Sequence, residues 1–296
     1  MGSVEAGIGL ALLAAVMANI ASLLKHRGCQ HVPPVSIQAP LQSARSLAAS
    51  PWFAAGWGIA AVAWLIHIAA LSMAPISLVQ AALAAGAVSL AVLSQRFFGH
   101  AVERRQWLAL LLGGVGLAIL ALTLPSIHGK HSDFATGAIV AFEGGLAVLA
   151  LSLAFGYRRR LFAARHGALL AVLAGTLFAL AGVAIKGLTG EGSLPLLFLA
   201  PWVGAIIACG VLAQYSAVAS LQRGGAIETI GLMGLVASSA QILSGVVVFG
   251  DPLASGTVGI GLQATAFALL CVSALLLPPA RAAAAPTARP LIGRLA

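Results

Sequence analysis

Long apolar stretches alternate with short polar segments along the whole chain. A helix needs about 20 apolar residues to cross the hydrocarbon core of a bilayer. Nine stretches come close to that length, so the pattern predicts an all-α polytopic membrane protein with nine transmembrane helices. The predicted spans are residues 5–24, 51–72, 75–95, 106–124, 135–155, 167–185, 195–218, 226–249 and 256–277.

The connections between these stretches differ in length. The first connection, residues 25–50, is long, whereas the second, around residues 72–75, is very short. The helices on either side of that short connection must therefore form an antiparallel pair. The last residues, 279–296, are rich in Ala, Pro and Arg, and we expect them to form a flexible tail.

The composition agrees with a membrane environment. Of the 296 residues, 60% are hydrophobic and 8% are charged, and the mean hydropathy is +1.04. A soluble domain carries about 25% charged residues, so this composition excludes an ordinary soluble enzyme and a disordered chain. The three cysteines are scattered, which supports neither a disulfide framework nor a zinc site. The opening residues MGSVEAG lack a basic segment, so we expect no cleavable signal peptide.

The basic residues divide unevenly between the two sides of the predicted topology. With nine spans, fourteen of the 16 Lys and Arg residues fall on one side and only Lys130 and Lys186 on the other. Cytoplasmic loops carry an excess of Lys and Arg, so we expect a multi-pass protein of the plasma or inner membrane. Its N-terminus would lie outside and its C-terminus in the cytoplasm. The fourteen are Lys25, Arg27, Arg45, Arg96, Arg104, Arg105, Arg158, Arg159, Arg160, Arg165, Arg223, Arg281, Arg289 and Arg294.

Two parts of the chain resemble each other. The first span ends LLAAVMANIASLLK at Lys25, and the sixth ends LAGTLFALAGVAIK at Lys186, 161 positions later. The segment SQRFFGHAV is echoed by GVVVFGDPL, with their FG pairs 151 positions apart. Five spans separate the copies, so the copies insert with opposite orientation. Inverted repeats of this kind are typical of secondary transporters, although Ala- and Leu-rich helices also resemble each other through composition alone.

The repeat divides the chain into four parts. Residues 1–124 would form the first repeat, with spans one to four, and residues 167–278 the second, with spans six to nine. Residues 125–166 would hold the joining fifth span and a basic loop, and residues 279–296 the cytoplasmic tail.

The stretch Trp64–Leu122 resembles the drug/metabolite transporter (DMT, EamA-like) superfamily, and within it the NIPA-type magnesium transporters. The similarity lies in the turn Ala74-Pro75-Ile76-Ser77-Leu78-Val79, in the FG pair after the third span, and in the glycines Gly113, Gly114 and Gly116 of the fourth. The resemblance implies nine spans in a 4+1+4 inverted repeat. Residues 215–277 fit as the second copy.

The chain departs from the pattern of the magnesium transporters at two points. The acidic residue expected after FG is His100 in the first copy and Asp251 in the second, and the expected VTP is Ile227-Glu228-Thr229. The resemblance therefore implies the fold more strongly than magnesium transport, because one fold serves many solutes.

Glu143 is the leading candidate for a binding residue. It lies near the middle of the fifth span and is followed by Gly144 and Gly145. An ionisable group inside a span is costly and is a functional candidate by default. The glycines would let a helix or ligand approach the carboxylate, which could exchange protons or bind a cation or an amine. The alternative is a neutral side chain bonded to a neighbouring helix.

Five further polar residues are candidates for the same solute- or ion-binding site. Glu228 matches a polar family position, but near a helix start it also suits the helix dipole. His67 is either a proton relay or a packed histidine. The side-chain amide of Gln80 either binds solute or joins helices. Asn19 and Tyr215 are weaker candidates of the same kind, as are Gln214, Gln241 and Gln263.

Other notable residues have simpler explanations. Lys25 and Lys186 end their spans, so we expect their ammonium groups to reach the interface by snorkelling. His128, His131 and Asp133 lack a diagnostic metal spacing and are expected in a solvated loop. The run Arg158-Arg159-Arg160 is expected to anchor the topology and contact anionic lipid.

Three classes of function remain open. The first is a secondary transporter that moves a small solute by alternating access. The second is a transporter or channel for Mg²⁺, for which Glu143 and Glu228 are the available acids. The third is a membrane-embedded enzyme or lipid-handling scaffold, for which the loops offer no catalytic constellation. We expect no enzymatic activity, no cofactor and no nucleic-acid partner, and we leave a homodimer open.

Overall fold

The computed structural model describes residues 2–36, 39–74, 78–79, 82–83, 86–99, 102–123, 135–161, 165–190, 196–250 and 256–277. The described residues form helices and no strands, as predicted. The helices are α1 (Gly2–Cys29), α2 (Pro40–Ala48), α3 (Pro51–Met73), α5 (Ala87–Phe98), α6 (Arg104–Thr123), α7 (Thr136–Arg158), α8 (His166–Gly190), α9 (Leu196–Arg223), α10 (Ala226–Val247) and α11 (Gly256–Leu276).

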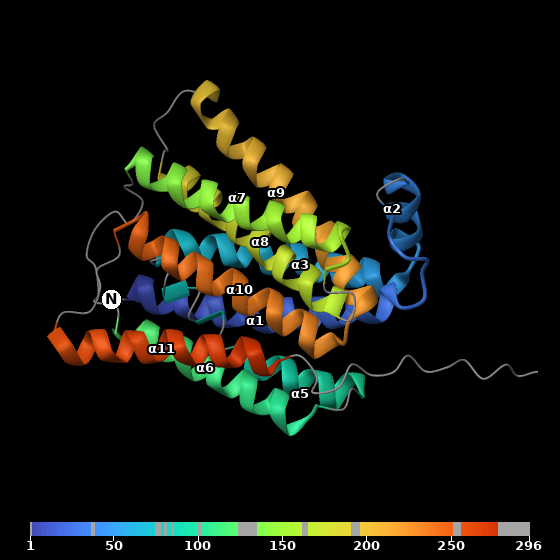
Figure 1. The fold of residues 1–296 in the computed structure, drawn as a ribbon, viewed down its shortest axis with the longest axis horizontal. Coiled ribbons are helices and arrows are strands. Elements are labelled where there is room, and N and C mark those ends of the chain that lie inside the picture. The colour runs from blue at the N-terminus through green and yellow to red at the C-terminus, as the bar shows by residue number, and fades with distance from the viewer. Residues whose placement is uncertain are drawn as a thin grey trace, which may run out of the picture.

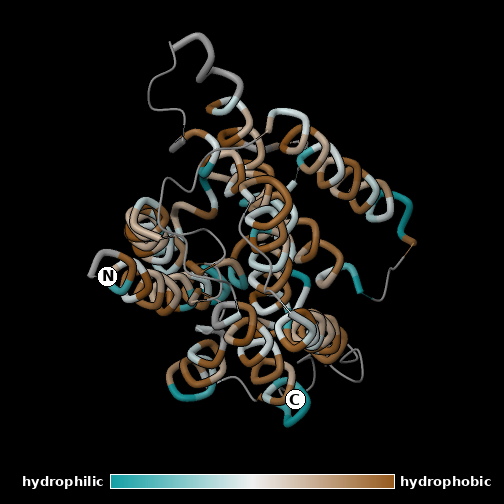
Figure 2. The backbone as a smooth tube through the Cα atoms, turned by 90° about the vertical axis from the view of Figure 1, so that its left-hand side faces the viewer, coloured by the Kyte–Doolittle hydropathy of each residue, from teal (hydrophilic) through white to brown (hydrophobic). Residues whose placement is uncertain are grey.

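Seven of these helices are long and apolar enough to cross a membrane. They lie within α1, α3, α7, α8, α9, α10 and α11. Large apolar side chains stay exposed on them, for example Leu65, Leu151 and Val258, which are 61%, 70% and 76% exposed. A soluble protein rarely exposes so much apolar surface, whereas lipid covers it in a bilayer. The helical coils are coloured mainly as hydrophobic in Figure 2, so the chain is a multi-pass helical membrane protein.

The two other predicted spans coincide with described helices in part. The fourth, 106–124, corresponds to α6, which has 20 residues. The third, 75–95, overlaps α5, which has 12 residues, and much of its first half lies outside the described residues. The long first connection contains the nine-residue α2, which the span pattern did not predict because the helix is too short and polar to cross a bilayer.

The long helices run side by side along one axis and alternate in direction (Figure 1). The helices α1, α5, α7, α9 and α11 run one way, and α3, α6, α8 and α10 run the other. Two ends of the bundle follow from this arrangement. We call the "basic end" the one where α1, α7 and α9 finish and α3, α6, α8 and α10 begin; the other is the "opposite end".

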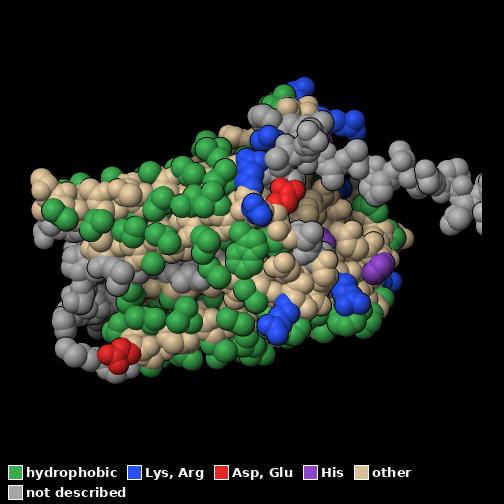
Figure 3. Space-filling model, turned by 90° about the horizontal axis from the view of Figure 1, so that it is seen from below, with side chains coloured by type: hydrophobic (Ala, Val, Ile, Leu, Met, Phe, Trp, Pro, Cys, Tyr) green, Lys and Arg blue, Asp and Glu red, His purple; other side chains and the backbone are tan. Residues whose placement is uncertain are grey.

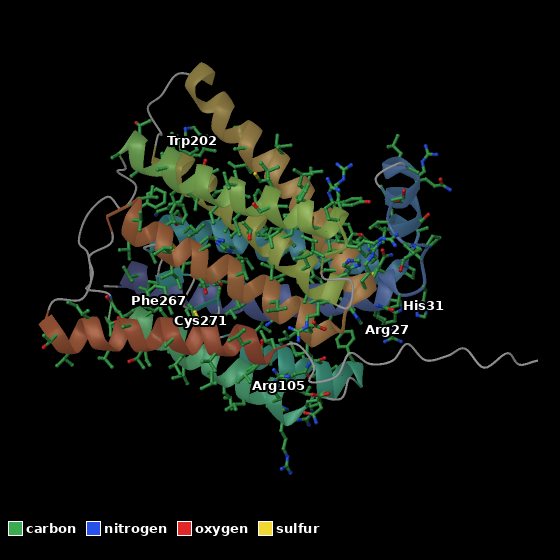
Figure 4. All side chains as sticks on the ribbon, viewed as in Figure 1. Arg27, His31, Arg105, Trp202, Phe267 and Cys271 are labelled. Atoms are coloured by element: carbon green, nitrogen blue, oxygen red, sulfur yellow. The ribbon has the colours of Figure 1, made fainter. Side chains whose placement is uncertain are left out.

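Charge separates the two ends. The described Lys and Arg residues lie at the basic end with the exception of Lys186. In Figure 3 the basic side chains gather over one half of the face shown, and hydrophobic side chains cover much of the other. Arg27, His31 and Arg105 lie at the basic end, whereas Trp202 lies in the opposite half (Figure 4). Grouping of basic residues at one end is what the fourteen-to-two division predicts for the described part of the chain.

Packing organises the helices into pairs. The most extensive contacts join α1 with α3, α8 with α9, and α6 with α11, while α8 also packs against α7 and α10. The α6–α11 pair is close and antiparallel, because Ser273 donates a hydrogen bond to the Ala109 carbonyl at 2.7 Å and Arg105 to the Leu275 carbonyl at 2.9 Å. At the basic end, Gln30 and Gln222 bind the chain after α1 to the end of α9.

Candidate functional site

The most buried ionisable side chain at the interface between helix pairs is that of Lys186. It is 4% exposed, and its Nζ donates a hydrogen bond to the Leu71 carbonyl of α3 at 3.3 Å. Lys186 lies on α8, so this bond links the α8–α9 pair to the α1–α3 pair. Because the ammonium group bonds inside the bundle, the expectation that Lys186 snorkels to the interface is wrong.

Lys25, its counterpart in the sequence repeat, is also buried, at 9% exposed. Its stem packs over Gly56, and its Nζ lies 5.9 Å from the centre of the Trp57 ring. Both contacts belong to α3, the neighbour of α1. The snorkelling expectation is therefore wrong for Lys25 too, since glycine and tryptophan on α3 hold the side chain against the neighbouring helix.

Gln241 of α10 lies one helical turn away from Lys186. The side chain of Gln241 occupies the space beside Gly182, where a Cβ on the glycine would clash with it. Gly182 and Lys186 are four residues apart on α8, so they share a face. Gln241 is 5% exposed. The face of α8 that carries Lys186 therefore meets α10 at one level and α3 at the next.

Four polar residues lie at a similar depth in four helices. His67 and Gln241 stand six residues before the ends of α3 and α10, and Glu143 and Gln263 stand seven residues after the starts of α7 and α11. These helix termini are all at the opposite end (Figure 1). At 1.5 Å per residue, each residue lies roughly 10 Å from the end of its own helix. We call these four residues the polar layer.

Glu143 itself is half-buried, and one carboxylate oxygen, Oε1, is enclosed without a hydrogen-bond partner among the described residues. A buried acceptor without a partner is uncommon in native proteins and calls for an explanation. Phe142, the preceding residue, packs with Val183 of α8 in the core at the opposite end. Glu143 therefore lies on α7 near the face that packs on α8, while the opposite face of α7 is exposed.

The two glycines after Glu143 do not pack against a helix. A Cβ on Gly144 or Gly145 would meet nothing within 4 Å, and both residues are exposed. The expectation that they admit a neighbouring helix is therefore wrong for this chain. They face outward because α7 packs chiefly on α8 and lies at the edge of the bundle.

Gln263 of α11 is 6% exposed, and its Nε2 has no hydrogen-bond partner among the described residues. Glu143 and Gln263 belong to α7 and α11, which lie on different sides of the bundle in Figure 1. The polar layer thus contains two buried atoms, an acceptor and a donor, that the described residues leave unbonded.

Glu228 has a local structural role. Gly225 is the N-cap of α10, and Glu228 is the third residue of the helix, with its side chain buried. An acid at this position is typical of the acidic half of a capping box and suits the helix dipole. Glu228 lies at the basic end, roughly 20 Å from Glu143 along the axis at 1.5 Å per helical residue, so the structure does not bring the two acids together.

The remaining candidates fall into three groups. Asn19 joins helices, because its Nδ2 donates to the Gly86 carbonyl and to Ser89 Oγ of the α5 segment, both at 2.9 Å. Tyr215 is half-buried and packs against the main core from α9. Gln80, His100 and the cluster of His128, His131 and Asp133 lie outside the described residues.

Sequence reasoning missed Lys186, and a signal for it was present. Gly182 and Gly187 flank Lys186 on α8, and a Cβ on Gly187 would lie 2.9 Å from the Trp202 ring. Glycines on both sides of a lysine indicate close helix packing, which leaves the lysine stem little room to reach the interface. The described residues contain no group of three or more His, Cys, Asp and Glu side chains that could hold a metal ion.

Comparisons with known proteins give no match: no family model, no curated protein and no solved structure matches the chain.

Proposed function

We propose that the chain is a secondary transporter that moves a small polar solute by alternating access between two inverted halves. The first half comprises α1, α3, α5 and α6, the second comprises α8, α9, α10 and α11, and α7 joins them. With α6 and the predicted third span, residues 75–95, counted as spans, the total is nine. The resemblance of Trp64–Leu122 to the drug/metabolite transporter superfamily supports the same architecture.

The observation that carries the proposal is matched packing in the α1–α3 and α8–α9 pairs. A Cβ on Gly7 would lie 3.1 Å from the Ala74 Cβ, and a Cβ on Gly167 would lie 2.8 Å from the Gly224 Cα. The glycines of α1 and α8 are 160 positions apart, and their partners are 150 apart. The start of one helix thus meets the end of its neighbour at equivalent positions in both pairs.

The far ends of the two pairs match as well. Gly28 of α1 packs against Phe53 of α3, and Gly187 of α8 packs against Trp202 of α9. These positions are 159 and 149 apart. Two helix pairs that repeat their contacts at both ends support a duplicated unit more strongly than shared Ala and Leu content does.

Buried positions follow the same offset. Ala11 and Ala171 are both fully buried, as are Leu23 and Val183, and each pair is 160 positions apart. The FG echo has a counterpart in the backbone. Gly99 and Gly250 follow α5 and α10 with φ of 66° and 68°, the left-handed conformation that glycine adopts after a helix.

The directions of the helices support inversion rather than simple duplication. In Figure 1, α1 runs toward the basic end and α8 runs away from it. Between the halves, α6 packs against α11 and α5 against α10, which are pairings of equivalent helices. Such self-pairings are expected on a two-fold axis in the membrane plane, the symmetry of inverted-repeat transporters. By the positive-inside rule, the basic end would face the cytoplasm.

The solute would bind among the polar layer and Lys186. These groups lie within the hydrocarbon depth of a bilayer, about 30 Å thick, where polar side chains mark solute pathways. The Lys186–Leu71 bond crosses from one half to the other, so relative motion of the halves would change it. Glu143 Oε1 offers an unbonded acceptor to the solute, whereas Gln263 lies across the bundle from Glu143 (Figure 1) and would not contact the same small molecule.

Magnesium is the alternative cargo. Mg²⁺ is usually bound through one or two carboxylates and keeps several waters. The described acids inside spans, Glu143 and Glu228, lie roughly 20 Å apart by the helical rise. A magnesium site would therefore use Glu143 without Glu228, and Mg²⁺ belongs in the transport test as one arm.

The test is uptake by liposomes that contain the purified chain. The panel holds Mg²⁺, amines, amino acids and organic anions, each with and without a pH gradient. We expect at least one solute to enter in a protein-dependent, saturable manner. We expect Glu143→Gln to reduce its uptake about tenfold, which corresponds to 1.4 kcal/mol.

The matched control is Glu103→Gln, which changes an exposed acid before α6. It should leave uptake within about twofold of the wild type, since a surface charge contributes little. Absence of protein-dependent uptake for the whole panel, or equal uptake by Glu143→Gln and the wild type, would contradict the proposed site and mechanism.

A further inference from the structure

The turn between α7 and α8 contains a hollow at the basic end. Its volume is about 450 Å³, and it is lined by Tyr157, Arg158, Arg160 and His166. The first two end α7, Arg160 lies in the turn, and His166 begins α8. We propose that this hollow binds the phosphate group of an anionic membrane lipid. The inference is independent of the proposed transport function.

The charge of the lining suits a phosphate group. Neither Arg158 nor Arg160 has an ion-pair partner among the described residues, and no acidic residue lines the hollow. The third arginine of the run is engaged elsewhere, because the Arg159 guanidinium lies 5.1 Å from the Phe155 ring centre. Two arginines that remain available can bind phosphate oxygens through paired N–H donors.

His166 contributes a second observation that indicates a ligand. Its Nε2 is enclosed, yet it has no hydrogen-bond partner among the described residues. The ring is held edge-on against Tyr157, with the ring centres 5.2 Å apart. The ring that carries this unbonded nitrogen therefore has a fixed position in the wall of the hollow, and a buried polar atom without a partner is uncommon.

The backbone at Arg160 has a fixed, left-handed conformation. Arg160 has φ of 56°, the only positive φ of a non-glycine residue in the described part of the chain. Two hydrogen bonds brace it, from the Arg160 N–H to the Tyr157 carbonyl and from the Leu161 N–H to the Gly156 carbonyl, each at 3.1 Å. A left-handed arginine is unfavourable, so the bracing bonds keep a conformation that an isolated turn would avoid.

The surroundings favour a lipid over a soluble phosphate compound. Leu151 and Phe155 on α7 and Leu161 in the turn are 70%, 56% and 63% exposed. These apolar side chains lead from the hollow along the outer surface of α7. A lipid whose headgroup occupies the hollow could lay an acyl chain along them, whereas free phosphate would leave them uncovered. Basic pockets near the cytoplasmic ends of transmembrane helices bind anionic headgroups in this manner.

The test measures lipid retention by the full-length chain in detergent micelles. Purified protein is given phosphatidylglycerol, phosphatidylcholine or inorganic phosphate at equal concentrations, and bound molecules are counted by native mass spectrometry. We expect phosphatidylglycerol to be retained in preference to phosphatidylcholine. Inorganic phosphate should neither bind nor displace the lipid.

Two charge-matched double variants locate the site. Arg158→Gln with Arg160→Gln should weaken phosphatidylglycerol binding about 10- to 30-fold, since each basic residue contributes a several-fold factor. Arg45→Gln with Arg96→Gln removes the same charge from exposed positions at the same end and should change binding less than about threefold. His166→Phe keeps a ring against Tyr157 and should weaken binding about threefold, with an unchanged unfolding temperature.

Several outcomes would overturn the proposal. Equal losses in the two double variants would show that attraction is spread over the basic end rather than concentrated in the hollow. Equal retention of phosphatidylcholine and phosphatidylglycerol would remove the preference for an anionic headgroup. Displacement of the lipid by inorganic phosphate would assign the hollow to a soluble phosphate compound.

Discussion

The α1–α3 pair and the α8–α9 pair have the same contacts but different surroundings. Both are antiparallel and repeat their glycine contacts at each end. In the apolar window of α1, however, 33% of residues are buried, against 72% in that of α8. The difference arises because α7 and α10 pack extensively on α8, whereas among the described residues α1 packs extensively only on α3. Two helix pairs with similar contacts thus differ in position: α8 lies at the centre of the bundle and α1 at its flank.

The lysines of the two pairs show what this difference does. Lys25 packs against Gly56 and Trp57, the neighbour helix within its own pair. Lys186 instead bonds to the Leu71 carbonyl of the other pair. The two lysines stand near the ends of the corresponding helices of the proposed repeat, and the contacts of Lys25 stay within one half whereas Lys186 bridges the halves. In the proposed mechanism, Lys186 would respond to relative motion of the halves, whereas Lys25 would not.

The largest expected effect comes from filling the closest contact between a glycine and the backbone of a neighbouring helix. In Gly28→Ala the new Cβ would lie 2.5 Å from the Phe53 backbone nitrogen, whereas in Gly187→Ala it would meet the Trp202 ring at 2.9 Å. Backbone yields less readily than a side chain, so we expect Gly28→Ala to cost about 3 kcal/mol of stability and Gly187→Ala about 1 kcal/mol. Unfolding temperatures in one detergent measure both. Equal losses would contradict the different packing of the two pairs.

The next largest effect distinguishes the role of Lys186 from that of Lys25. Lys186→Met keeps the length of the side chain and removes the bond between the halves, so we expect solute uptake to fall about tenfold, or 1.4 kcal/mol. Lys25→Met should leave uptake within about twofold, because Lys25 packs against Gly56 and Trp57 of its own half. The assay is the liposome uptake described above, normalised to folded protein. A larger loss for Lys25→Met than for Lys186→Met would reverse the assignment.

The smallest expected effect tests whether Gly99 and Gly250, the glycines after α5 and α10, are structurally equivalent. Gly99 and Gly250 have nearly equal positive φ values and open space around the Cβ position. Alanine in the left-handed region costs about 1 kcal/mol, so Gly99→Ala and Gly250→Ala should destabilise the chain by similar amounts. Unfolding temperatures that differ strongly between the two variants would show that the two turns are not structural counterparts.

The hydrophobic pattern predicted most of the helices, because a run of about 20 apolar residues has few other stable structures in lipid. It did not predict α2, whose nine residues leave no such signal. It also placed the side chains of Lys25 and Lys186 wrongly, because apolar residues surround these helices and the pattern does not reveal which face is buried.

The candidate site was predicted only in part, because the sequence pattern does not reveal which face of each helix is buried. Glu143 lies within α7, a helix long and apolar enough to cross a membrane, as the pattern predicts, but the exposure of Gly144 depends on α7 lying at the edge of the bundle. Glu228 could have been recognised as a cap from its spacing after Gly225, since an acid at the third helical position is typical of a capping box. Lys186 required the packing of α8 against α3, which only the tertiary structure provides.

The inverted arrangement of the halves is tested most directly by the sidedness of two equivalent residues. Glu5 and Arg165 are 160 positions apart, lie near the starts of α1 and α8, and are both exposed. In a chain without Cys29, Cys209 and Cys271, the variants Glu5→Cys and Arg165→Cys are treated in intact cells with a membrane-impermeant thiol reagent. The account predicts labelling of Glu5→Cys from outside and of Arg165→Cys only after the membrane is opened. Labelling of both variants from the same side would contradict it.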